Sequence, residues 1–111
     1  MEKNYKCVLA IVNTGFSEVA MESAKGAGAT GGTILTARGT ASKDAEKFFN
    51  ISIQPEKEIV MILVSSDIKD AILKGLYHVI GLDTQAQGIA FTMPVDDVVG
   101  IGNSKEKKSK E

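Results

Sequence analysis

Residues 28–39 read Gly28-Ala-Thr-Gly-Gly-Thr-Ile-Leu-Thr-Ala-Arg-Gly39, a glycine-rich turn that leads directly into a short strand. The adjacent glycines favour a turn, because glycine adopts backbone conformations that other residues avoid. The run Thr33–Ala37 is rich in β-branched residues, which favour strands. Arg38-Gly39 ends this strand, so the elements on either side of residues 28–39 decide what kind of domain it belongs to.

Two elements of different periodicity precede this turn. The run Tyr5–Val12 is short, apolar and rich in β-branched residues, which predicts a central strand. From Phe16 to about Gly28, apolar and small residues recur at helical spacing, which predicts a helix of about three turns. Thr14 or Ser17 is expected to cap this helix, because a hydroxyl oxygen accepts hydrogen bonds from the free N–H groups of the first turn.

A second set of elements follows after a long connection. Residues 40–56 show no clean period, and a connection of this length is usually functional or disordered. The very apolar run Glu58–Ser65 predicts a third strand. Ser66-Asp67 is expected to start a second amphipathic helix that Gly81 ends. Ile89–Val95 then predicts a fourth strand.

The order strand, helix, strand, strand, helix, strand predicts an α+β domain of the ferredoxin-like type. Two crossovers folded onto one antiparallel sheet place both helices on one face. Few aromatic residues remain to cover the other face, and an open apolar face on a small domain usually means an oligomer. We expect one domain over residues 1–102, which includes the connection 40–56, and a disordered polar tail over 103–111, which holds four lysines.

Composition excludes several classes of function. The chain has 111 residues, a formal net charge of −1, and 13 basic against 14 acidic residues, so no net field favours nucleic acid or a membrane surface. The apolar run Ile59–Val64 is far too short to span a bilayer, and we expect a cytoplasmic protein without stable membrane insertion. The single cysteine, Cys7, can form neither an internal disulfide nor a cysteine zinc site.

The residues that could carry catalysis do not form a recognisable set. His78 falls inside the second predicted helix with no partner close in sequence, and Cys7 is expected to be an inert core thiol. Asp96 and Asp97 are expected to cap a helix or to be solvated. We therefore predict that the protein is not an enzyme. A metal site built from Cys7, His78, Asp83, Asp96 and Asp97 has no recognised spacing and stays a minor hypothesis.

The stretch 28–39 resembles the PII nitrogen-regulatory protein family, and two later stretches match in order and spacing. Glu58–Asp67 is similar to the family's third strand and the start of its second helix, and Ala90–Ile101 to its fourth strand and closing segment. The resemblance covers about residues 5–102. It implies a ferredoxin-like homotrimer that binds an adenine nucleotide such as AMP, ADP or ATP, or a cyclic nucleotide, in clefts between subunits. It implies no required cofactor.

Within the resemblance, Thr33 matches a nucleotide-contacting threonine, and Gly39 matches the base of the loop that docks onto partner proteins. Leu63 matches the point where strand backbone meets the adenine, and Gln87-Gly88 matches the end of a phosphate-binding loop. Arg38 is a candidate to replace lost cations. The partner-binding loop is implied to lie in residues 40–56, where the candidates are Ser42, Lys43, Phe48 and Phe49.

Three expected phosphate-binding cations are missing from this sequence. Ile89 stands where the resemblance implies a lysine, and Gly100 and Gly102 stand where it implies two arginines. Each charge-assisted contact is worth roughly 1.5–3 kcal/mol, so we expect a ligand with less charge than ATP. Three functions remain open: an effector-sensing regulator of a partner in nitrogen or carbon metabolism, an interaction module that has lost its ligand, and a metal-binding trimer.

Overall fold

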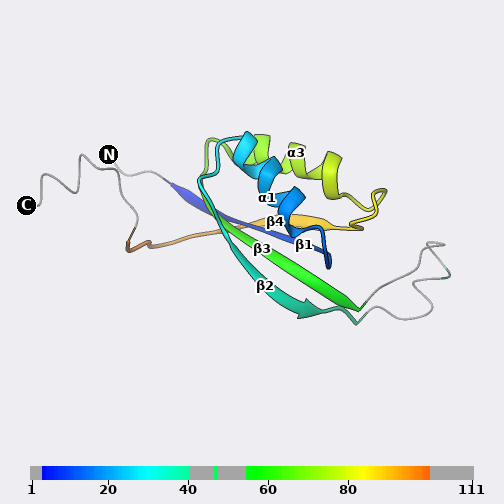
Figure 1. Cartoon of the computed structure of the whole chain (residues 1–111). Helices are drawn as coiled ribbons and strands as arrows, with labels where there is room; N and C mark the ends of the chain where they lie inside the picture. Colours follow the sequence, from blue (N-terminus) through cyan, green and yellow to red (C-terminus); the bar gives the residue numbers. More distant parts are fainter. Residues whose placement is uncertain (1–3, 41–46, 48–54, 101–111) are drawn as a thin grey trace, which may run out of the picture.

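The computed structural model describes residues 4–40, 47 and 55–100, which form one antiparallel sheet covered by two helices (Figure 1). The strands lie in the order β2-β3-β1-β4. This confirms the predicted ferredoxin-like arrangement, with β4 at an edge of the sheet as its proline requires. The elements are β1 (Tyr5–Asn13), α1 (Ser17–Gly26), β2 (Thr33–Arg38), β3 (Glu56–Ser65), α3 (Lys69–Ile80) and β4 (Ile89–Pro94).

The starts of both helices differ from the prediction. Phe16 and Ile68 occupy the N-cap positions, and neither helix has a side-chain capping hydrogen bond. Ser17 is already the first residue of α1 and is buried, so its hydroxyl lies one position too late to cap. The predicted caps at Thr14 or Ser17, and the predicted start at Ser66-Asp67, are therefore wrong. Chain reversal before α1 comes instead from Gly15, whose φ of +102° favours glycine.

Alternate residues of the two central strands face the helices and form the core. In the central part of β1 and β3 the even-numbered residues Val8, Ala10, Val12, Val60, Ile62 and Val64 are buried, whereas the odd-numbered residues between them are partly covered or exposed. This period of two is what a sheet with one covered face produces. The core is completed by the inner faces of the helices and consists mainly of Val8, Ala10, Val12, Ala20, Ala24, Val60, Ile62, Val64, Ile72, Leu76 and Ile80.

The other face of the sheet is apolar and open. Strand pairing places odd-numbered residues of all four strands on this face, which we call the open face. Met61, Phe91 and Met93 on it are each 40–42% exposed, and Ile89 is 51% exposed. Cys7 also lies on the open face and is only partly buried, so the expectation of a core thiol is wrong. Burial against neighbouring side chains raises the pKa of the Cys7 thiol.

Two predicted segments lie outside the described residues. Ser42, Lys43, Phe48 and Phe49 of the expected partner-binding loop belong to 41–46 and 48–54, and the expected polar tail belongs to 101–111. Within the described part of the chain, no helix is long and apolar enough to cross a membrane.

Candidate functional site

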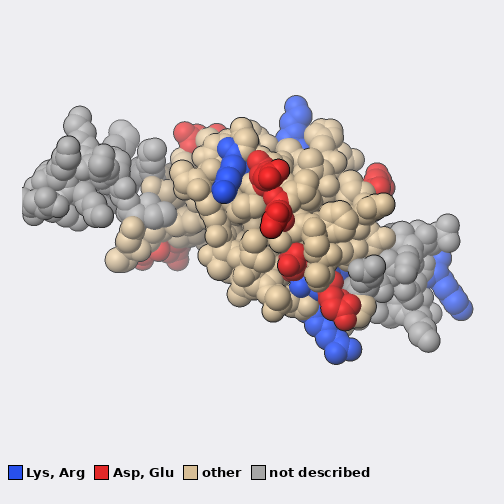
Figure 2. Space-filling model, in the orientation of Figure 1, with Lys and Arg blue, Asp and Glu red and all other residues tan. Residues whose placement is uncertain are grey.

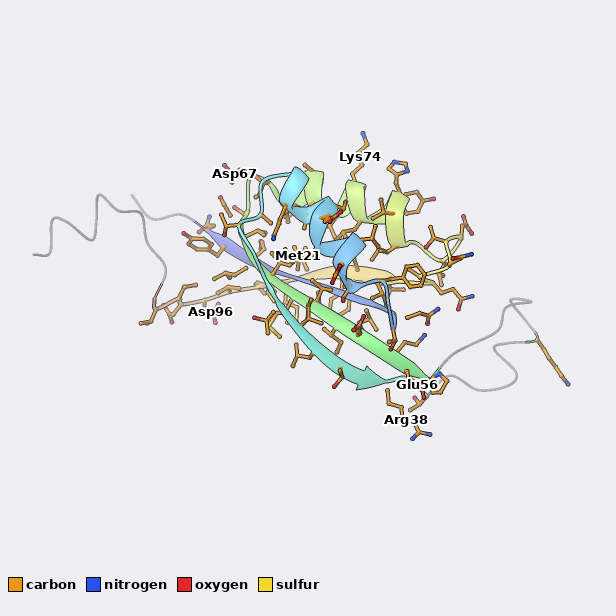
Figure 3. All side chains as sticks on the ribbon, in the orientation of Figure 1. Met21, Arg38, Glu56, Asp67, Lys74 and Asp96 are labelled. Carbon is orange, nitrogen blue, oxygen red and sulfur yellow. The ribbon has the colours of Figure 1, made fainter. Side chains whose placement is uncertain are left out.

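A pocket of about 490 Å³ opens at the end of β3 where α3 is about to begin. The turn after α1, the end of β3 and the start of β1 contribute its walls. Asp67, which is labelled in Figure 3, marks this end of the molecule. The pocket is lined by Tyr5, Gly28, Ala29, Thr30, Leu63, Val64, Ser65, Asp67, Ile68 and Gly100.

Backbone polar groups of Leu63 face the side of β3 on which β2 has ended. The Ser66 N–H donates to the Asn4 carbonyl oxygen, so even-numbered residues of β3 direct their N–H and C=O toward β1. Odd-numbered residues therefore direct theirs toward β2, whose pairing stops at Thr33 opposite Met61. Leu63 lies two residues beyond Met61 along β3, so no residue of β2 pairs with its N–H and C=O. An adjacent donor and acceptor of this kind can bond the edge of a nucleobase.

Close approach of the chain to β3 explains the glycine before β2. A Cβ atom built on Gly32 would lie 2.8 Å from the Met61 carbonyl oxygen and 3.1 Å from the Met21 Sδ atom. Only glycine therefore lets the turn descend onto β3 at this point. Thr33 follows as the first residue of β2, close to the pocket but outside its lining.

Another group of predicted site residues lies at the opposite end of the sheet. Arg38 ends β2 directly opposite Glu56, and Figure 3 shows both labels together, far from Asp67. The Gly39 N–H donates to the Pro55 carbonyl oxygen at 2.6 Å, which closes the base of the connection. A Cβ atom on Gly39 would lie 3.0 Å from the Lys57 Cε atom, so the lysine side chain packs across this glycine.

The loop Gly81–Gly88 uses its own amides internally. The Gln87 N–H donates to the Thr84 carbonyl oxygen at 3.0 Å, and the Gly88 N–H donates to the Ile80 carbonyl oxygen at 2.6 Å. The Ala86 N–H donates to the Thr84 Oγ1 atom at 3.2 Å. A phosphate site in such a loop depends on free backbone N–H groups. These three amides are occupied, so the loop in this conformation is a poor phosphate cradle.

A buried asparagine, which the sequence analysis does not single out, holds this loop against the sheet. Asn13 is 4% exposed, and its side-chain Nδ2 donates to the Gln85 carbonyl oxygen at 3.1 Å. Its Oδ1 accepts a hydrogen bond from the Lys57 Nζ at 2.7 Å. These contacts cross more than 40 positions of the sequence, so only a polar residue at the end of an apolar strand could have hinted at them.

The predicted nucleotide-binding residues form two groups that one chain does not bring together. In β1 and β3, the pair Cys7–Leu63 and the pair Asn13–Lys57 are six positions apart. At about 3.4 Å per residue, they are separated by roughly 20 Å. Thr33 and Leu63 lie toward one end of the sheet. Arg38, Gly39, Gln87 and Gly88 lie at the other.

The side chains of the metal-site hypothesis are scattered. Among the residues that the structure describes, no three His, Cys, Asp or Glu side chains come together as a metal site would require. Cys7 lies on the open face. His78 lies on α3, where the centroid of its ring is 5.5 Å from the centroid of the Tyr77 ring. Figure 2 also shows basic and acidic side chains interspersed on the visible face, without a large basic field.

Comparisons by sequence and by structure give different results. No protein-family model and no curated protein matches the chain. Many solved structures are similar in fold, and three of them illustrate the similarity. A PII-like signaling protein from Thermus thermophilus is 22% identical, with a TM-score of 0.64 over 84% of this chain and 87% of that chain.

The other two structures contain nucleotides. CPII, a nitrogen regulatory PII-like protein from Thiomonas intermedia K12, is bound to ADP, AMP and bicarbonate; it is 17% identical, with a TM-score of 0.65 over 88% of this chain and 97% of that chain. The B. subtilis GlnK–ATP complex is 16% identical, with a TM-score of 0.60 over 86% of this chain and 84% of that chain. The chain therefore has the ferredoxin-like fold of PII-like signalling proteins, as the order of its elements and the resemblance over residues 5–102 predicted.

Proposed function

We propose that this protein is a non-enzymatic, PII-like regulator that binds a small effector and controls a partner protein through residues 40–56. The observation that carries the proposal is the Leu63 peptide edge beside a pocket of about 490 Å³. It supplies a preformed donor and acceptor for a flat heterocycle. The nucleotide-bound CPII and GlnK structures support an adenine nucleotide as the effector.

A homotrimer is the proposed functional form. The open face is too apolar for a protein that works as a single copy. Packing the open faces of three copies together buries it. Such an assembly also offers a way to join the two halves of the predicted site, because the end of one copy that holds Leu63 can meet a neighbour's end that holds Gly39 and Gly88.

The effector is proposed to carry little phosphate charge. The amides of Gln87 and Gly88 are occupied, and Ile89 stands beside them instead of a lysine. A triphosphate therefore finds few partners at this loop, whereas the Leu63 peptide edge, which we propose binds the base, lies beyond the end of the β2 pairing. AMP or a cyclic nucleotide should bind more tightly than ATP. The proposed partner belongs to nitrogen or carbon metabolism in the cytoplasm, and the similarity to CPII, a nitrogen regulatory PII-like protein, supports the part of this proposal that concerns nitrogen.

Thermal unfolding in the presence of AMP, ADP, ATP and cyclic AMP tests this proposal. A ligand at about 100 times its Kd adds roughly 2.7 kcal/mol to the free energy of unfolding, or a Tm shift of order 10 °C for a domain of this size. We expect the largest shift with AMP or cyclic AMP. Absence of a shift with every nucleotide would instead favour an interaction module that has lost its ligand.

A pair of tryptophan substitutions locates the effector site. Thr30→Trp places a large ring at the lining of the pocket, whereas Thr36→Trp places the same ring on β2 away from it. We expect Thr30→Trp to abolish the nucleotide-dependent Tm shift and Thr36→Trp to keep it. Equal shifts in both variants would place the nucleotide elsewhere.

A further inference from the structure

Asn13, Lys57, Gln85 and Gln87 form a polar cluster at the end of the sheet opposite the pocket. We call it the Asn13 cluster. It joins the loop Gly81–Gly88 to the strand that leaves the long connection, although the two are far apart in the sequence. Neither the fold nor the proposed effector pocket explains why a buried amide should bridge these two segments.

The oxygen and the nitrogen of the Asn13 side-chain amide both form hydrogen bonds, the first as an acceptor and the second as a donor. The Oδ1 atom accepts from the Lys57 ammonium at 2.7 Å. The Nδ2 atom donates to the Gln85 carbonyl oxygen at 3.1 Å and, more weakly, to the Gln87 Oε1 atom at 3.5 Å. An amide does both at once, because its oxygen can only accept and its NH₂ group can only donate. The Lys57 contact therefore fixes which way the amide faces the loop.

The backbone of Asn13 also forms a hydrogen bond with the loop Gly81–Gly88. Its N–H donates to the Ala86 carbonyl oxygen at 2.9 Å, and Ala86 itself is fully buried. The next residue, Gln87, has a φ of +46°, a conformation that is unfavourable for a residue with a side chain. A loop held in this conformation depends on the hydrogen bonds that fix it, and Asn13 donates three of them, to Gln85, Ala86 and Gln87.

At its other end the cluster reaches the base of the connection. The stem of Lys57 lies across Gly39, where a Cβ atom would be only 3.0 Å from Cε. Gly39 is in turn bonded to Pro55 by its N–H at 2.6 Å. A displacement of this base moves Lys57, and loss of Lys57 leaves the Asn13 amide free to turn away from Gln85.

We propose that Asn13 is a positioning residue that couples the conformation of the loop Gly81–Gly88 to the base of the connection at Gly39 and Lys57. Its use in signalling rests on the proposed function, because an effector or partner that shifts one segment would then shift the other. The coupling itself is a property of the ligand-free chain. It can therefore be measured whether or not a nucleotide binds.

Amide hydrogen exchange in the ligand-free protein tests the coupling. Lys57→Met removes the ammonium but keeps the stem on Gly39. We expect the Gln87 and Gly88 amides to exchange at least threefold faster, while the Ile62 amide in the centre of the sheet is unchanged. Glu58→Met is the matched control, because Glu58 is the next residue and its carboxylate accepts from the Gly15 N–H instead of contacting Asn13. Glu58→Met should leave the Gln87 and Gly88 amides at their wild-type rates.

The same measurement in an Asn13→Asp background separates coupling from simple structural support. Aspartate can still accept from Lys57 but cannot donate to Gln85, so the side-chain link between the two halves of the cluster is removed, while the backbone bond to Ala86 remains. We expect fast exchange at Gln87 and Gly88 that Lys57→Met no longer increases. An unchanged loop in Lys57→Met, or an equal response to Lys57→Met in both backgrounds, would overturn the proposal.

A reverse experiment keeps the proposal testable if Asn13→Asp does not fold. Gln87→Ala removes a side chain that accepts a hydrogen bond from Asn13. Gln85→Ala is the control, because Asn13 donates to the backbone carbonyl oxygen of Gln85, which the substitution keeps. We expect faster exchange of the Gly39 amide in Gln87→Ala only. Identical Gly39 exchange rates in the two variants would contradict the coupling.

Discussion

Met61→Glu is expected to convert the protein from a species of three times 11.8 kDa to a single chain of 11.8 kDa, as measured by light scattering. Met61 lies near the middle of the open face, opposite Leu9 on β1 and Thr33 on β2. In the proposed trimer each copy would have to bury a carboxylate against apolar side chains. The effective penalty is several kcal/mol for each unpaired ion, and it would apply three times in one assembly.

Val19→Glu is the matched control for this experiment. Val19 is 39% exposed and Met61 is 40% exposed, but Val19 lies on α1, on the helical side of the sheet. We expect Val19→Glu to retain the mass of the wild-type assembly. A wild-type protein that is already a single chain at working concentration would refute the trimer, and a trimeric Met61→Glu would show that the open face is not the interface.

The reactivity of Cys7 gives an independent readout of the same prediction. Its thiol lies on the open face, and burial raises its pKa, so less of the reactive thiolate is present near neutral pH. We expect alkylation of Cys7 to be slow in the wild-type protein and several-fold faster in Met61→Glu, because dissociation uncovers the face. Equal rates would mean that Cys7 is as accessible in the assembly as in the single chain.

Most of the fold could be predicted because it depends on local periodicity. The strands β1 and β3 are visible in the sequence as two apolar runs, and the pattern between Phe16 and Gly28 has the period of a helix, whereas the alternate burial along the two strands is known only from the structure. The helix starts could not be predicted in the same way. A hydroxyl near a helix start suggests a cap, but whether it occupies the N-cap position is decided by one residue of register, as Ser17 shows.

Only part of the candidate site could be predicted from the sequence. Leu63 and Gly88 were found through resemblance, and Leu63 does line the pocket. The Asn13 cluster could not be predicted from the sequence, because its contacts join residues 44 and 72 positions apart and such pairing depends on the sheet register. The internal use of the Gln87 and Gly88 amides is likewise a property of the folded loop, which the residue types do not reveal.

Gly88→Ala is expected to lower the free energy of unfolding by about 3 kcal/mol, which corresponds to a Tm decrease of roughly 12 °C at fixed protein concentration. A Cβ atom at this position would lie 2.7 Å from the Ile80 carbonyl oxygen, 2.9 Å from the Val12 Cγ1 atom and 3.1 Å from the Ile11 carbonyl oxygen. Two of these three atoms belong to the backbone, so the clash cannot be relieved by rotating a side chain.

Gly31→Ala separates this steric effect from the general effect of replacing a glycine. A Cβ atom on Gly31 would meet nothing within 4 Å, so we expect a change in unfolding free energy within about 0.5 kcal/mol. If Gly88→Ala were equally mild, the loop would not be pressed against α3 and β1 as the structure shows. The occupied Gly88 amide, which bonds Ile80 from the same close position, would then be free to bind phosphate. The Gly88→Ala measurement therefore also tests why a weakly charged effector is proposed.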